Sequence, residues 1–298
     1  MDNIFGKLAQ LYRNGSLLIK LIYLNVAVFL ILRLSIVFLM LFNIDGRIIL
    51  NYFELPSDLY LLLVRPWTLV TYMFLHYDIW HILFNMIWFY WFGQIFLLFF
   101  SEKQMGGLYL LGGWTGAILF LLSYNIFPYF DSVDGFLLGA SAAILAIVVA
   151  TAVYAPDYKI NLLFFGAISL KYIAIITIVI DLLSITSSNA GGHIAHLGGA
   201  LMGWWFVSSW RKGHDMTRFI NLIVDRFVTM FKPGPRKKMK IKKMNISQNP
   251  RRESDMDYNA RKHREMEEID HILDKIKQSG YSALSDAEKK KLFDASKK

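Results

Sequence analysis

The sequence predicts an all-α polytopic membrane protein, and three observations lead to this fold class. The chain of 298 residues has a mean hydropathy of +0.39, which is too apolar for an ordinary soluble domain. Several apolar stretches approach the ~20 residues that a helix needs to cross a bilayer. Most of the positive charge follows the last stretch. We expect six spans, at residues 20–43, 78–100, 106–127, 137–155, 170–187 and 190–210.

The charge distribution predicts the orientation of these spans. Residues 1–210 hold 9 Lys and Arg against 10 Asp and Glu, and residues 211–298 hold 23 against 13. Because cytoplasmic segments carry an excess of Lys and Arg, the C-terminus is expected in the cytoplasm, and six spans place the N-terminus there too. The chain contains no cysteine, which excludes disulfides, thiolate metal sites and a cysteine nucleophile.

Three stretches outside the spans also have an expected environment, and the chain is expected to divide into four segments. The amphipathic stretch 215–231 suits the inner membrane surface. The basic run 232–243 suits anionic lipid better than nucleic acid, because it directly follows a last span. Residues 160–169 are apolar and are expected at the membrane interface. The segments are a cytoplasmic N-terminus (1–16), a six-helix membrane domain (17–210), a basic juxtamembrane and linker segment (211–257) and a small cytoplasmic helical hairpin (258–298).

The C-terminal hairpin is predicted from its apolar spacing and its end signals. Gly280 suits the end of a helix, and Ser285 with Glu288 forms a capping box for a second, shorter helix. The apolar stripe of the first helix consists of Ile269, Ile272, Leu273 and Ile276.

Four polar residues share one depth in this topology. Spans two, four and six all run from the outer to the inner face, and each carries polar side chains near its start, where hydrocarbon penalises them. The four polar residues are His81 and Asn85, which are one helical turn apart, Ser141 and His196. Their common position in the outer third of the membrane predicts a single water-accessible cavity.

The spacing of small residues favours contact between Ser141 and His196. Gly199 and Gly203 follow His196 on its own face of the helix, and span four is rich in Gly and Ala. Small residues let membrane helices approach closely. A serine hydroxyl beside an imidazole is the arrangement of a nucleophile and its general base.

Over residues 17–210 these features resemble the rhomboid family of intramembrane serine proteases. A lone Gly-x-Ser carries little weight, but four motifs in order on the expected spans are specific. They are Arg65-Pro-Trp-Thr-Leu-Val-Thr-Tyr-Met-Phe-Leu-His76, His81-Ile-Leu-Phe-Asn85-Met86, Gly139-x-Ser141 and His196-x-x-Gly199-x-x-x-Gly203.

The resemblance implies an endopeptidase that cleaves transmembrane segments of membrane-protein substrates near the outer face. It makes Ser141 the nucleophile and His196 its base, a dyad without an aspartate. It assigns oxyanion stabilisation to His81 and Asn85, and close backbone approach to Gly139. It implies a six-helix rhomboid-like bundle, no cofactor and no metal. It also favours a multi-pass protein of the bacterial type, in a bacterial cytoplasmic membrane, with a C-terminal helical extension.

The chain departs from the family pattern at two positions. Many rhomboids have Gly directly after the serine, where this chain has Ala142. Many carry an aromatic residue one turn after the serine, against which the base stacks, and here that position is Leu145. The base is then less firmly oriented, or another ring replaces the stack.

Three alternatives stay open. The chain could be a catalytically inactive rhomboid-like protein that binds membrane clients, although members of that class usually lack the serine or the base. His81 and His196 could ligate a haem, which would leave Ser141 and Asn85 without a role. A transporter is disfavoured, because no inverted repeat is evident and intramembrane charges are few.

Several polar side chains have no partner assigned from the sequence. Arg33 and Asp181 lie within spans one and five, and each needs a partner or water access. Asp181 as a third catalytic group is disfavoured, because nothing in the sequence places it near His196. His193 is expected to face water or the neighbouring loop, and His76 is expected to anchor the interface.

Overall fold

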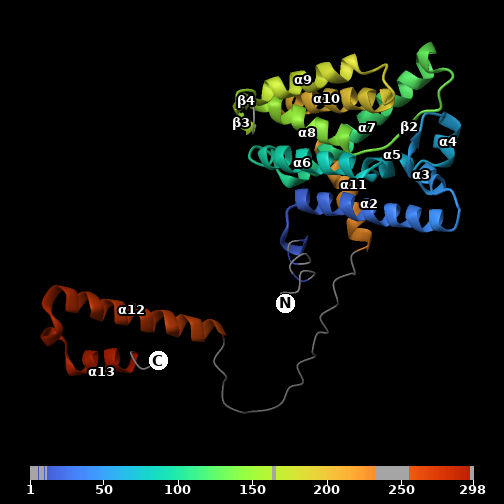
Figure 1. The fold of residues 1–298 in the computed structure, drawn as a ribbon. Coiled ribbons are helices and arrows are strands. Elements are labelled where there is room, and N and C mark those ends of the chain that lie inside the picture. The colour runs from blue at the N-terminus through green and yellow to red at the C-terminus, as the bar shows by residue number, and fades with distance from the viewer. Residues whose placement is uncertain (1–5, 7–9, 11, 163–165, 232–254, 296–298) are drawn as a thin grey trace. The chain divides into compact units, whose positions relative to one another are not determined.

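The computed structural model describes residues 6, 10, 12–162, 166–231 and 255–295. The chain divides into two compact units, Met1–Pro233 and Gly234–Lys298, and both are mostly helical (Figure 1). The basic run 232–243 lies outside the described residues, as does much of the N-terminal segment 1–16. The predicted domain boundaries therefore stay predictions.

In the first unit, a helix lies at each of the six predicted spans (Figure 1). These helices are α2 (Leu17–Leu41), α6 (Ile79–Phe96), α7 (Glu102–Ile126), α8 (Ser141–Tyr154), α9 (Leu170–Leu183) and α10 (Ala190–Trp210). Among the described helices, α2 and α7 are long and apolar enough to cross a membrane, and α8 is a shorter apolar helix. A mostly helical fold is thus confirmed, and the count of six membrane crossings stays a prediction.

Helices α8 and α10 pack closely in the first unit. Helix α8 is buried along most of its length, because it consists mostly of Ala, Val and Ile side chains that fit between α7, α6 and α10. A Cβ added at Gly199 would collide with the carbonyl oxygen of Ala142, and one at Gly203 with that of Ala146. The two glycines therefore allow the backbones to touch. This contact brings His196 close to the N-terminal end of α8.

Side-chain caps fix where the helices near the site begin. Asp78 caps α6, and its carboxylate accepts hydrogen bonds from backbone N–H groups of the first turn, including that of His81 at 2.9 Å. Ser101 and Gln104 form a capping box at the start of α7. Arg33 on α2, for which the sequence offered no partner, lies within electrostatic reach of Asp78.

Two buried tyrosines fasten the segment between α2 and α6. The hydroxyl of Tyr72 donates to Gly113 O at 2.6 Å, and that of Tyr109 donates to Met73 O at 2.9 Å. Because Gly113 and Tyr109 both lie on α7, these two hydrogen bonds hold the segment to that helix. Its short helices are α3 (Arg47–Phe53), α4 (Leu59–Val64), α5 (Thr68–Thr71) and η1 (Tyr72–Phe74).

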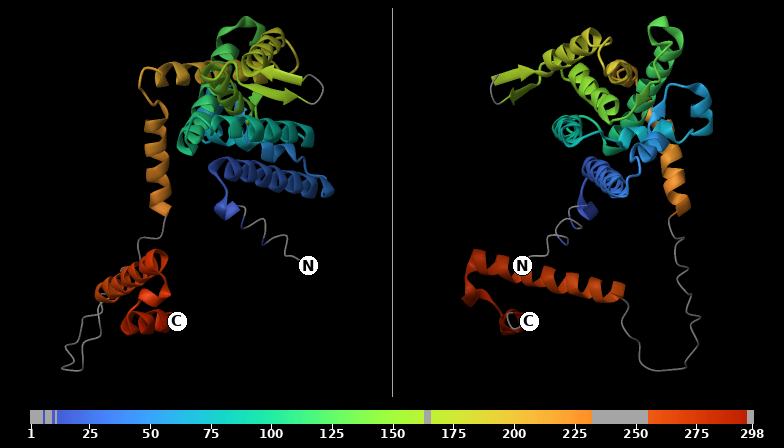
Figure 2. Two further views of the ribbon diagram at one scale, coloured as in Figure 1. Left: turned by 90° about the vertical axis from the view of Figure 1, so that its left-hand side faces the viewer. Right: turned by 45° about the vertical axis from the view of Figure 1, so that its right-hand side comes forward.

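Two small antiparallel sheets among the described residues correct the all-α prediction. Strand β1 (Leu55–Pro56) pairs with β2 (Phe136–Leu137), which leads into α8. Strands β3 (Lys159–Leu162) and β4 (Gly166–Ser169) form a hairpin beyond the ends of α8 and α9 (Figure 2). The described parts of the segment 160–169, which was expected only as an apolar stretch at the membrane interface, thus contain paired strands.

Helix α11 (Thr217–Phe231) packs on the start of α7. Lys103 forms an ion pair with Asp225 at 2.6 Å, and Gln104 donates to Asp215 at 3.2 Å. The helix expected over 215–231 is therefore present. Its apolar side chains Phe219, Leu222 and Ile223 are exposed.

The second unit contains α12 (Asp255–Ser279), η3 (Tyr281–Ala283) and α13 (Asp286–Ala295), with α12 and α13 packed on each other. The predicted capping box is confirmed, because Ser285 N–H donates to Glu288 at 2.7 Å and Glu288 N–H donates back to Ser285 Oγ at 3.4 Å. Ile272 of the predicted stripe is buried, whereas Leu273 is exposed.

Candidate active site

Ser141 is the first residue of α8, at a sharp turn that follows strand β2. Gly139 has a φ of +126°, a conformation that L side chains rarely adopt, and its N–H donates to Tyr72 O at 2.9 Å. A Cβ at Gly139 would lie 3.1 Å from His81 Nε2 and 3.5 Å from Ser141 Oγ. The absence of a side chain here therefore lets the histidine ring approach the serine.

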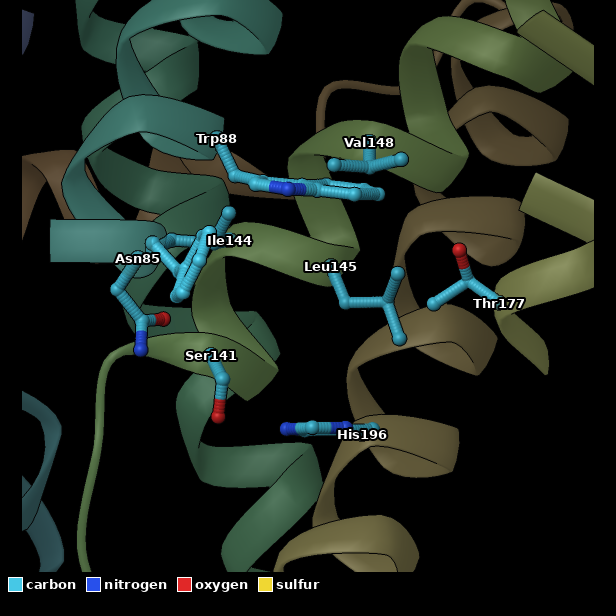
Figure 3. A pocket seen from close by; sticks show the side chains of 9 residues that line it. Asn85, Trp88, Ser141, Ile144, Leu145, Val148, Thr177 and His196 are labelled. Carbon is cyan, nitrogen blue, oxygen red and sulfur yellow. The ribbon is translucent and has the colours of Figure 1, made fainter. Parts of the chain in front are cut away.

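A cavity of 180 Å³ opens in front of Ser141 (Figure 3). Its walls come from four helices and are mostly apolar, and they include Trp88, Leu145 and Val148. The hydroxyl of Ser141 and one edge of the His196 ring face each other across the cavity in Figure 3. The lining residues are Phe84, Asn85, Trp88, Ser141, Ile144, Leu145, Val148, Thr177 and His196.

Of the four residues expected at one cavity, Ser141, His196 and Asn85 line it, and His81 is not among its lining residues. No hydrogen bond joins Ser141 to His196 in the described part of the chain. Catalytic hydrogen bonds in unliganded sites are often long and tighten only with substrate. The expected hydrogen bond between these two residues stays a prediction.

His196 is held from its other side by a carboxylate. Its Nδ1 lies 2.9 Å from Asp181 Oδ1, and Nδ1 of His193 lies 2.8 Å from the same oxygen. Asp181 is 3% exposed, so its carboxylate is buried between α9 and α10. The expectation that Asp181 lies apart from His196 is wrong. His193, which was expected to face water or the neighbouring loop, contacts the same carboxylate.

Nε2 of His81 lies beside Gly139, two residues before Ser141. Its Nδ1 accepts a long hydrogen bond, 3.4 Å, from the backbone N–H of Tyr77. Since a neutral imidazole carries one proton, acceptance at Nδ1 leaves the proton on Nε2, which makes Nε2 a donor. Asn85 donates one amide hydrogen to His81 O at 2.9 Å and keeps a second one, and its side chain lines the cavity.

His76 lies behind His81 and is buried, so the expectation that it anchors the interface is wrong. The two imidazole rings meet edge to face, with their centroids 5.1 Å apart. Burial and the neighbouring His81 ring lower the pKa of His76 to about 3. His76 is therefore neutral at physiological pH and acts as a packing support for His81.

Ala142 and Leu145, the two departures from the family pattern, lie in different surroundings. The methyl group of Ala142 faces Gly116 of α7, where a glycine leaves room for it. Leu145 lines the cavity beside His196 (Figure 3) and offers no ring for the imidazole to stack on. Among the described residues, the ring contact of His196 is an edge contact with His193, with centroids 5.9 Å apart.

One group of described side chains also offers the donor atoms that a metal ion would need, and it consists of Asp181, His193 and His196. Their ligand atoms all lie within 4.8 Å of one another. However, both nitrogens lie at hydrogen-bond distance from one shared oxygen. Ligands that each sit about 2.0–2.2 Å from a zinc ion are spaced more widely around it. The arrangement fits a carboxylate that accepts two hydrogen bonds.

A count along the α9–α10 hairpin could have revealed this contact. Asp181 lies two residues before the end of α9 at Leu183, and His193 lies three residues after the start of α10 at Ala190. In an antiparallel hairpin such positions face each other. His196 then follows His193 by three residues, on the same helix face.

The chain matches known families in two regions. Residues 64–211 match the model of the rhomboid domain, and residues 253–298 match a family of unknown function, DUF6576. All residues predicted for the site fall within the first region.

Two relatives match about half of this chain. This chain is 29% identical over 171 residues to presenilin-associated rhomboid-like protein A, mitochondrial, of Danio rerio. That match covers 54% of this chain and 43% of that protein. This chain is 33% identical over 161 residues to RHOMBOID-like protein 12, mitochondrial, of Arabidopsis thaliana, which covers 50% of this chain and 48% of that protein. The chain thus spans less than half the length of either relative, and its residues 64–211 are a rhomboid domain.

Proposed function

We propose that this chain is an intramembrane serine endopeptidase that cleaves transmembrane segments of other membrane proteins near the outer face. The observation that supports this most is the cavity, where the hydroxyl of Ser141 and the ring of His196 face each other beside the amide of Asn85 (Figure 3). The apolar walls of the cavity suit the side chains of an unwound transmembrane segment.

In the first half of the reaction, Ser141 Oγ forms a bond to the scissile carbonyl carbon while its proton passes to His196 Nε2. The π electrons of the carbonyl move onto its oxygen. When the C–N bond breaks, His196 returns the proton to the leaving amine. Water then attacks the acyl-enzyme and gives a proton to His196, which passes it to Ser141 Oγ as the new carboxyl group leaves.

Three donors surround the position of the oxyanion. His81 Nε2–H and the second amide hydrogen of Asn85 come from α6. The backbone N–H of Ser141 belongs to the first turn of α8, where N–H groups have no partner within the helix. The positive end of the α8 dipole adds to the attraction. One such donor typically contributes about 2.7–4 kcal/mol of transition-state stabilisation.

We further propose that both termini lie on the side of the membrane where the positive charge of residues 211–298 gathers. Rhomboid proteins are integral membrane proteins, which agrees with the apolar composition. The names of the two relatives place those proteins in mitochondria, so they give no support to the bacterial cytoplasmic membrane expected from the sequence.

Cleavage after reconstitution tests the proposal. The full chain in liposomes, mixed with a membrane protein that carries one transmembrane segment, should release fragments cut inside or beside that segment. Ser141→Ala and His196→Ala should abolish the cut. Ser208→Ala is the matched control, because this hydroxyl on α10 donates to Trp204 O of its own helix and is not among the residues that line the cavity. Cleavage that persists in Ser141→Ala would overturn the assignment of the nucleophile, and a wild-type chain that leaves the substrate uncut would favour the client-binding role.

A further inference from the structure

The candidate base is attached to a buried carboxylate that a Ser-His dyad does not require. Asp181 is 3% exposed in an otherwise apolar helix, and its Oδ2 has no hydrogen-bond partner among the described residues. A buried carboxylate without partners is costly. Here Oδ1 is shared by Nδ1 of His193 and Nδ1 of His196. The two imidazoles therefore keep the carboxylate in this position.

This contact selects one tautomer of His196. An ionised carboxylate only accepts hydrogen bonds, so the proton of the neutral ring must sit on Nδ1. Nε2 is then unprotonated, which is the form that can accept the proton of Ser141. Without Asp181, the ring would be free to carry its proton on Nε2 and could not act as the base.

The same contact replaces a missing support. Leu145 stands where the family pattern has an aromatic residue for the base to stack on, and Leu145 cannot stack. A hydrogen bond of 2.9 Å to a buried carboxylate oxygen, which His193 also contacts, holds the Nδ1 edge of the ring in place. His193 contributes by holding the carboxylate from the other side.

We infer that Asp181 is a positioning residue for His196, so that the reacting groups form a Ser141–His196–Asp181 triad with His193 as the second anchor of the carboxylate. The inference rests on the proposed function. When Ser141 transfers its proton to Nε2, His196 becomes an imidazolium whose Nδ1–H still donates to Asp181. The carboxylate stabilises that cation and takes no proton itself.

The rate of labelling by a fluorophosphonate tests this role, because the probe reports activation of Ser141 without any protein substrate. The full chain in detergent is labelled over time, and both the rate constant and the final labelled fraction are measured. Asp181→Asn should lower the rate constant at least ~100-fold, since a positioned general base contributes about 10²–10⁴-fold. The labelled fraction should remain near that of the wild type. A purely structural role would instead lower the fraction and leave the rate constant of the folded molecules unchanged.

Two further variants sharpen the test. Asp181→Glu keeps the carboxylate and should label faster than Asp181→Asn, which also covers the case in which the Asn variant folds poorly. Asp157→Asn is the control, because it removes an exposed carboxylate paired with Lys171 at 2.6 Å, and it should label at the wild-type rate. An Asp181→Asn variant that labels as fast as the wild type, or faster than Asp181→Glu, would overturn this inference alone. A wild-type chain that takes no label would overturn the proposed function and this inference with it.

Discussion

Replacing Gly199 by Ala tests whether the contact between α8 and α10 sets the distance between Ser141 and His196. The added Cβ would lie 2.8 Å from the carbonyl carbon of Ala142 and 3.1 Å from its Cα. Both atoms belong to the backbone of α8, so no side-chain rotation relieves the contact. Ordinary contacts of this kind begin at 3.4 Å, and the carbonyl oxygen of Ala142 lies nearer still to the added Cβ, so the helices must separate by roughly 1 Å.

The separation should be visible in both stability and rate. Overpacking of this kind typically costs about 1–3 kcal/mol of unfolding free energy. A misplacement of ~1 Å at a catalytic group can cost about 10²-fold in rate. We therefore expect Gly199→Ala to melt at a lower temperature and to react with a fluorophosphonate one to two orders of magnitude more slowly than the wild type.

Gly106→Ala is the matched control for this experiment. A Cβ at Gly106 meets the far end of the Leu17 side chain, at 2.7 Å from Cδ2, and that end can move aside. This variant should keep the wild-type rate and stability. If Gly199→Ala labels and melts like the wild type, the close approach of the two helices does not determine the site geometry, and the reasoning fails.

Three further predictions concern the oxyanion donors and two titrating groups. His81→Ala and Asn85→Ala should each lower kcat about 10²–10³-fold with little change in KM for a reconstituted substrate, and a raised KM with unchanged kcat would contradict a transition-state role. Thermal stability in detergent should fall as the pH is lowered from 6.5 toward about 3, because the unfolded chain protonates His76 while burial holds the pKa of the folded His76 at about 3. His76→Phe should make the melting temperature less dependent on pH in this range, and an unchanged dependence would contradict the assignment to His76. In a peptide of residues 253–298, the helical circular dichroism should fall between pH 4.5 and about 2, because hydrogen bonds from Lys275 and Ser285 lower the pKa of Glu288 to about 2 and favour the folded state only while Glu288 is ionised. Glu288→Gln should remove that transition, and a transition that persists would show that another group titrates.

The positions of the long helices could be predicted from the sequence, because runs of apolar residues with clear polar ends are strong signals. The span expected at 190–210 coincides with α10, Ala190–Trp210. The β3–β4 hairpin could not be predicted, because a short apolar run does not distinguish a strand from an interfacial segment. The short helices between α2 and α6 also depend on tertiary contacts, such as the buried hydroxyl of Tyr72 on Gly113.

Part of the candidate site followed from depth alone. Ser141, His196, Asn85 and His81 were expected at one level of one cavity, and the first three line one cavity. The role of Asp181 was missed, because the count that places it opposite His193 depends on where α9 ends and α10 begins. A buried acidic residue in an apolar span nevertheless predicts a hydrogen-bond partner, and here two histidines three residues apart are those partners.

The most direct test of the proposed activity is to label the purified full chain with a fluorophosphonate and to locate the modified residue by mass spectrometry. We predict a single modified serine, Ser141, and loss of the modification in His196→Ala, whose serine remains in place without its base. A well-folded chain that takes no label, or that carries the label on another serine, would contradict the assignment of Ser141 and His196 as nucleophile and base.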